Sequence, residues 1–148
     1  MVVQVPTERS HRRFSIHPAL SAASMVAVAI HLWGLYRPIS PPVPVWFPGE
    51  DKLEHLVGFA IPLFLLLVSY RSLLRNRGRK TSRAFVVVLT AGFAAHAVIS
   101  ELLQYDFYIS RTGDPADVAA DLVGCAVAFV GYALIELHAK PYSARSSP

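Results

Sequence analysis

The residues of this chain that could carry chemistry fall in three short polar stretches, separated by long apolar runs. They combine carboxylates and an imidazole, groups that transfer protons in general acid–base catalysis, with cationic side chains that could bind an anion. His55 and Glu101 are the candidate general bases, and Asp117 is a third candidate for a catalytic role. The candidate polar cluster comprises Asp51, Lys52, His55, Glu101, Gln104, Arg111, Asp114, Asp117 and Asp121.

Helical spacing brings several of these residues onto shared faces. Asp51, His55 and Phe59 follow one another at intervals of four residues. Asp117 and Asp121 are also four residues apart, so each set lies on one side of a helix. A carboxylate at the centre of a bilayer costs about 2.5–3.5 kcal/mol, and less towards the interface. These polar faces are therefore expected to meet one another, or a water-filled cavity, rather than lipid.

Simpler interpretations compete with a functional one. The helix dipole favours acids such as Asp51 and Asp117 in a first turn, and charges at the ends of membrane spans are ordinary interfacial residues. Three side chains lie at or inside the ends of the apolar runs, where a functional or buried-network role is the favoured interpretation: His55, Glu101 and Asp121. Two isolated histidines are expected in the core: His31 and His96.

The elements that must position these residues are membrane-spanning helices. Of the 148 residues, 53% are hydrophobic and only 16% are charged, against about a quarter in soluble domains. Strands are disfavoured because an open sheet edge in lipid leaves backbone groups unpaired. The sequence predicts an all-α membrane protein, a four-transmembrane-helix bundle in one domain. A membrane domain is expected over 16–140, between disordered cytoplasmic tails over 1–15 and 141–148. Its helices are expected at about 18–36, 53–70, 84–104 and 117–137.

The first apolar run is expected to be a retained helix rather than a cleaved signal peptide. Arg9, Arg12 and Arg13 precede it, as in the basic region of a signal peptide. The run is, however, longer than the usual 7–15 apolar residues of such a peptide. It also ends at Tyr36 and Arg37 without a clear small-residue cleavage site.

The distribution of basic residues predicts the orientation of the bundle. The N-terminal tail, the connection over 71–83 and the C-terminal tail hold eleven of the fourteen Lys and Arg residues. The remaining three are Arg37, Lys52 and Arg111. Basic residues are enriched in cytoplasmic loops, so both termini are expected in the cytoplasm and the polar cluster at the outer leaflet.

Composition also argues against several other classes of function. The net charge of +4 does not indicate nucleic-acid binding, because the basic residues lie in short loops without interleaved aromatic residues. A single cysteine, Cys125, lies in an apolar run, where it is expected to pack as a small hydrophobe. A metal site using His55, Glu101 and Asp117 is a further idea, but no HExxH-type motif supports it, so no metal and no cofactor are predicted. The absence of an inverted repeat disfavours a transporter.

Two motif halves carry a resemblance to a known family. The first is D-K-x-x-H-x-x-x-F, read as Asp51, Lys52, His55 and Phe59. The second is E-x-x-Q followed by an arginine, acids and a glycine, read as Glu101, Gln104, Arg111, Asp114, Asp117 and Gly124. With four spans in matching order, the chain resembles the VanZ-like family of small bacterial membrane proteins over roughly residues 48–137. It departs from the family at Asp121, where asparagine is common, and at Ala128, where a second glycine is common.

The resemblance implies a multi-pass protein of the bacterial cytoplasmic membrane. The founding member of the family is associated with teicoplanin resistance, so a role in glycopeptide resistance is the expected function. Its partners would be the lipid bilayer and a glycopeptide or lipid-linked wall precursor at the outer leaflet; the sequence leaves the oligomeric state open.

An intramembrane enzyme acting on a phosphate- or acyl-bearing lipid, with Lys52 and Arg111 binding the anion, is one alternative. A structural scaffold is the other. Gly124 and Ala128 form a small-residue face, expected with Phe59 to pack the helices.

Overall fold

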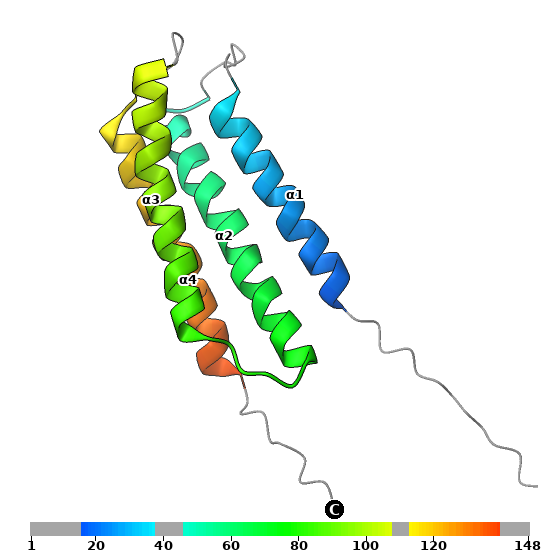
Figure 1. Cartoon of the computed structure of the whole chain (residues 1–148). Helices are drawn as coiled ribbons and strands as arrows, with labels where there is room; N and C mark the ends of the chain where they lie inside the picture. Colours follow the sequence, from blue (N-terminus) through cyan, green and yellow to red (C-terminus); the bar gives the residue numbers. More distant parts are fainter. Residues whose placement is uncertain (1–15, 38–45, 108–112, 140–148) are drawn as a thin grey trace, which may run out of the picture.

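The described part of the chain forms four long helices, each antiparallel to the next along the chain (Figure 1). The computed structural model describes residues 16–37, 46–107 and 113–139. The two predicted tails and Arg111 lie outside this part of the chain. The helices are α1 (Ile16–Tyr36), α2 (Glu50–Asn76), α3 (Arg83–Phe107) and α4 (Pro115–His138). Each is long and apolar enough to cross a membrane, so the predicted all-α fold of four apolar helices is confirmed.

Helix α2 extends further than its apolar run indicated, beginning at Glu50 and ending at Asn76. Gly49 precedes it with a φ of 84°, a left-handed conformation that glycine adopts without steric cost. Glu50 and Asp51 occupy the first turn, where the helix dipole favours acids. At the other end the backbone N–H of Arg77 donates to the carbonyl of Leu74 and closes the last turn. The basic residues after position 70 therefore begin on a helix rather than in a loop.

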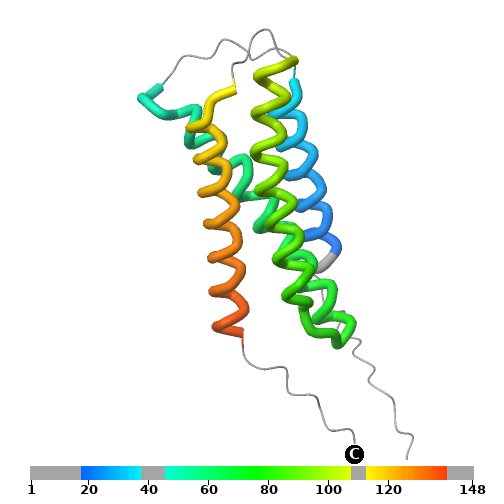
Figure 2. Tube along the Cα trace, turned by 60° about the vertical axis from the view of Figure 1, so that its left-hand side comes forward, coloured from blue at the N-terminus to red at the C-terminus, as the bar shows by residue number. Residues whose placement is uncertain are grey.

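Helix α2 lies obliquely across the bundle and contacts each of the other three helices (Figure 2). Its closest neighbour is α4, at Gly124. A Cβ atom at this position would collide with the backbone carbonyl oxygen of Leu56. Ala128, one turn further along, is also buried. Small residues let two backbones approach closely, which is a common basis of helix association in membranes.

The core lies along the inner faces of the helices, and the outer faces are apolar. Leu63 and Leu67 of α2 are fully buried, and Cys125 of α4 packs among the core side chains. Large apolar residues such as Val88 and Leu137 are well exposed. An exposed apolar surface around most of a bundle is the arrangement that a lipid solvent requires. The polar cluster is therefore the main departure from an apolar bundle.

Candidate functional site

Three helices place polar side chains at one end of the bundle, which we call the acidic end. There α2 and α4 begin and α1 and α3 end, at the top of Figure 1. Because the helices are antiparallel, the start of α2, the end of α3 and the start of α4 lie at the same level. The site there, called the acidic cluster, comprises Lys52, His55, Glu101, Asp114, Asp117 and Asp121. The antiparallel helices bring these six residues together, as the sequence predicted.

Lys52 is held by three carboxylates. Its Nζ atom donates hydrogen bonds to Asp51 Oδ2 at 2.9 Å, Asp114 Oδ2 at 2.6 Å and Asp117 Oδ1 at 2.5 Å. Asp117 lies in the first turn of α4 and Asp114 caps this helix, so the lysine joins the starts of α2 and α4. Hydrogen bonds to a charged donor are shorter and stronger than neutral ones. Lys52 therefore fixes the relative position of the two helix ends.

Asp114 links α4 to both neighbouring helices. Its Oδ1 atom accepts a hydrogen bond from the backbone N–H of Ala116 at 2.8 Å and so caps α4, with Pro115 in the first turn. Its own backbone N–H donates a hydrogen bond to Glu101 Oε2 at 3.1 Å, and this contact holds the Glu101 side chain of α3 in place. The hydrogen bond from Lys52 holds the pKa of the Asp114 carboxyl below its usual range.

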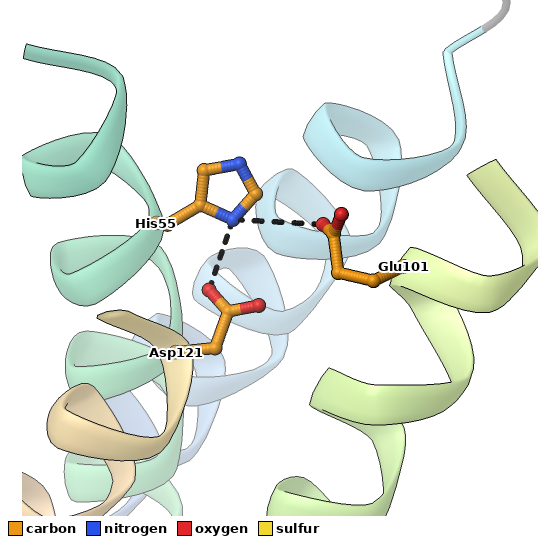
Figure 3. Close-up of side chains that lie close together, drawn as sticks. All are labelled: His55, Glu101 and Asp121. Atoms are coloured by element: carbon orange, nitrogen blue, oxygen red, sulfur yellow. Dashed lines mark hydrogen bonds and ion pairs between the residues drawn. The ribbon is translucent and has the colours of Figure 1, made fainter. Parts of the chain in front are cut away.

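His55 lies at the centre of the deeper part of the cluster (Figure 3). Its Nδ1 atom is 3.0 Å from Asp121 Oδ1 and 3.9 Å from Glu101 Oε1. Its Nε2 atom is 3.6 Å from Asp117 Oδ2. The Nδ1 side of the ring thus faces one carboxylate of α3 and one of α4, and the Nε2 side faces a second carboxylate of α4. Such contacts fix the orientation of the ring.

Two carboxylate oxygens beside His55 are buried without a hydrogen-bond partner among the described residues. They are Glu101 Oε1 and Asp121 Oδ2. The side chain of Glu101 is 5% exposed and that of Asp121 is fully buried. Buried polar atoms are almost always hydrogen-bonded, and each exception calls for a physical explanation. These two atoms distinguish the deep part of the cluster from the satisfied network around Lys52.

A layer of aromatic rings and histidines borders the cluster. His31 of α1 packs edge-on against Phe59, with ring centres 4.5 Å apart, and lies 5.5 Å from the ring of His96. His96 also shares a hydrogen bond of 2.9 Å with the hydroxyl of Tyr36. His31 is buried, as expected of a core histidine, but its Nε2 atom has no hydrogen-bond partner among the described residues, and His96 is only partly buried. A cavity of about 140 Å³ is lined by His31 and His55.

Two further predicted site residues, Asp51 and Gln104, lie at the edges of the cluster. Asp51 shares a helix face with His55, but its side chain is 63% exposed and it contacts Lys52 at the rim. Gln104 is buried, and its amide lies 3.5 Å from the carbonyl oxygen of Leu35 in α1. Arg111 lies outside the described residues. The structure therefore brings together six of the nine candidates and places Asp51 and Gln104 on either side of them.

Sequence reasoning missed a second polar network at the opposite end of the bundle, which we call the basic end. Arg71 Nε donates to Glu136 Oε1 at 2.6 Å, and the hydroxyl of Tyr132 donates to the same oxygen at 3.0 Å. A groove of about 1030 Å³ between α3, α4 and the end of α2 adjoins this network. Its basic lining residues are Arg71, Arg75, Arg79, Lys80 and Arg83. The signal that was available is Glu136, the one acid in the C-terminal half of the last apolar run.

The charges of the acidic cluster favour a cation over an anion. Lys52 was expected to bind a phosphate in an enzyme, but its ammonium group is already surrounded by three carboxylates. A phosphate at Lys52 would have to displace these acids and would face their negative charge. The anion-binding role of Lys52 is thus opposed by its contacts, while the carboxylates and imidazole can exchange protons or bind a cation.

No family model matches the chain, and no curated protein or solved structure shows significant similarity to it. The resemblance to VanZ-like proteins therefore rests on the two motif halves and on the presence of four apolar helices.

Proposed function

We propose that this chain is a VanZ-like integral protein of the bacterial cytoplasmic membrane. In this proposal both termini lie in the cytoplasm, and the acidic cluster lies at the outer leaflet, where it contributes to resistance against teicoplanin-type glycopeptides. The observation that supports it is the contact between the two motif halves. His55 of the first half lies 3.0 Å from Asp121 of α4, and Lys52 is hydrogen-bonded to Asp114 and Asp117 of the second. Residues about sixty positions apart thus form one site.

The orientation is supported by the charges at the two ends of the bundle. The basic end carries the six basic residues between positions 71 and 83, and eleven Lys and Arg residues fall in the segments on that side. A reporter that is active only outside the cytoplasm, fused within residues 76–82, should be inactive, and the same reporter fused near Trp46 should be active. The reverse pattern would place the acidic cluster in the cytoplasm and contradict an envelope-facing role.

The resistance role is tested in a glycopeptide-sensitive Gram-positive host. Expression of the wild-type chain should raise the minimal inhibitory concentration of teicoplanin at least fourfold. Glu101→Gln, which keeps the shape of the side chain, and His55→Gln should each abolish the increase at equal membrane levels of the protein. Glu136→Gln removes a carboxylate at the basic end and should leave the increase unchanged, so it is the matched control. An unchanged susceptibility with the wild-type chain would refute the resistance role.

An intramembrane enzyme is the second candidate, favoured by the surroundings of His55. Its ring is oriented by the hydrogen bond to Asp121, and it lines the cavity of about 140 Å³ together with Arg37 and Glu54. A histidine oriented by a carboxylate and reachable from a cavity can serve as a general base. Purified protein incubated with labelled lipid-linked wall precursors should then yield a product that the His55→Gln variant does not form.

A scaffold role predicts a different pattern from either of these functions. If the acidic cluster serves only to join α2, α3 and α4, then its variants should lose resistance only to the extent that they lose folded protein. Membrane levels and thermal stability of His55→Gln and Glu101→Gln, measured beside susceptibility, separate the scaffold role from the two functional roles. Full stability with complete loss of resistance would exclude a purely structural role.

A further inference from the structure

The deep part of the acidic cluster has the composition of a metal site. His55 of α2, Glu101 of α3 and Asp121 of α4 each offer a ligand atom, and these atoms lie within 4.8 Å of one another (Figure 3). Around an ion with bonds of about 2.0–2.1 Å, tetrahedral ligands are separated by about 3.3 Å. The distances from His55 Nδ1 to the two carboxylates, 3.0 Å and 3.9 Å, lie on either side of this value. Small side-chain adjustments would bring all three onto one ion.

The unpartnered oxygens are an independent observation that points to a cation. Glu101 Oε1 and Asp121 Oδ2 are buried beside His55 and accept no hydrogen bond from any described residue. The second oxygen of Glu101 accepts a hydrogen bond from the backbone N–H of Asp114, which holds this carboxylate in place. The second oxygen of Asp121 lies against His55 Nδ1, the nitrogen that would bind the ion, so a cation would replace this contact. A bound cation would explain the two unpartnered oxygens, because it would take them as ligands.

The surroundings of the other imidazole nitrogen support the same interpretation. In metal sites the second ring nitrogen of a ligating histidine usually donates to a carboxylate, which fixes the ring. His55 Nε2 lies 3.6 Å from Asp117 Oδ2. Asp117 is itself fixed by its hydrogen bond with Lys52. The shell of satisfied residues described above therefore orients the three inner side chains.

The geometry points to a site for one divalent transition-metal ion, Zn²⁺ or Mn²⁺, held by His55 Nδ1, Glu101 and Asp121 at the acidic end. Two buried carboxylates balance the charge of a divalent cation. One imidazole with two carboxylates is a donor set that these metals accept. Three protein ligands leave at least one coordination position open for water or a substrate, as in catalytic rather than structural zinc sites. This inference concerns the acidic cluster itself and holds whether or not the chain acts in glycopeptide resistance.

The test is the metal content of the purified protein. The chain is purified in detergent through a tag without histidines and analysed by mass spectrometry for metals, directly and after dialysis against Zn²⁺ or Mn²⁺ alone. The wild type should hold about one ion per chain. Glu101→Gln and Asp121→Asn, which keep the side-chain shapes, should each lower the retained metal at least tenfold. Glu136→Gln and His138→Ala change an acid and an exposed histidine elsewhere and should retain the wild-type amount.

A second measurement guards against loss of metal through unfolding. Because Cys125 is the only cysteine and is buried, a thiol-reactive dye reports the unfolding of the bundle directly. Added Zn²⁺ or Mn²⁺ should raise the melting temperature of the wild type and should not raise that of folded Asp121→Asn. Either of two results would overturn the inference: no retained ion in the wild type with either metal, or equal retention and equal stabilisation in the folded site variants. Susceptibility to teicoplanin is not used here, so the two proposals can fail separately.

Discussion

The two ends of the bundle differ in the sign of their charge and in how closely the helices meet. At the acidic end, ion pairs and hydrogen bonds join side chains from α2, α3 and α4. Lys52 alone contacts three carboxylates. At the basic end, a groove of about 1030 Å³ adjoins the helices, and its lining is rich in arginine. Within the described residues one ion pair joins helices there, between Arg71 and Glu136. One end is closed by polar contacts between helices, and the other is open and carries an excess of positive charge.

This difference indicates that the polar residues of the two ends serve different purposes. An excess of Lys and Arg in a loop needs no partner, because it orients the protein in the membrane through its charge. Carboxylates buried at the end of a span need partners, because unpaired charge is costly there. Buried contacts with defined geometry therefore make the acidic end the candidate site for the proposals above. The following predictions measure whether the two ends differ in this way.

The largest effect is expected from the closest approach of two helices, at Gly124 near the acidic end. Gly124→Ala would place a methyl group against the carbonyl oxygen of Leu56, which belongs to the backbone and cannot move aside alone. We expect a loss of about 3 kcal/mol of stability, at the upper end of the cost of overpacking. The measurement is thermal unfolding in detergent, followed by the reaction of a dye with Cys125.

Gly131 in the half of α4 near the basic end supplies the matched control. A Cβ atom there would lie 3.3 Å from the ring of Phe64, a side chain that can shift. The higher helix propensity of alanine offsets this contact. Gly131→Ala should therefore stay within about 1 kcal/mol of the wild type. Equal losses at the two glycines would show that α2 and α4 are not packed more tightly towards the acidic end.

The sequence predicted which residues converge, but not how they pair. Apolar run lengths and helix count fix the direction of each span, so the opening of α2 and the acids of α4 had to lie at one level. The polar faces indicated which sides of the helices meet, but helical spacing does not determine which individual side chains contact one another across them. The contact between His55 and Asp121 therefore required the structure. Glu136 was missed because α2 was expected to end at Tyr70, which left Arg71 in a loop.

A smaller effect is expected from breaking the contacts of Lys52. Lys52→Met keeps the length of the side chain but removes the ammonium group that contacts Asp114 and Asp117. We expect the free energy of unfolding to fall by about 1 kcal/mol, since the ammonium group is partly exposed. A double-mutant cycle with Asp117→Asn should give a coupling energy of similar size. Lys80→Met at the basic end, where Lys80 is exposed, should leave stability unchanged. A coupling energy near zero would mean that Lys52 does not join α2 to α4.

The smallest effect is expected from the ion pair at the basic end. Arg71 and Glu136 are 2.6 Å apart, but the glutamate side chain is 39% exposed, so water screens their attraction. A double-mutant cycle with Arg71→Gln and Glu136→Gln should give a coupling energy of about 0.5 kcal/mol, below that of Lys52 with Asp117. The same variants should keep the wild-type orientation in reporter fusions, because the remaining basic residues between positions 75 and 83 still mark that end. A coupling energy larger than that of Lys52 would contradict the distinction between the ends, because specific pairing would then hold the basic end together as well.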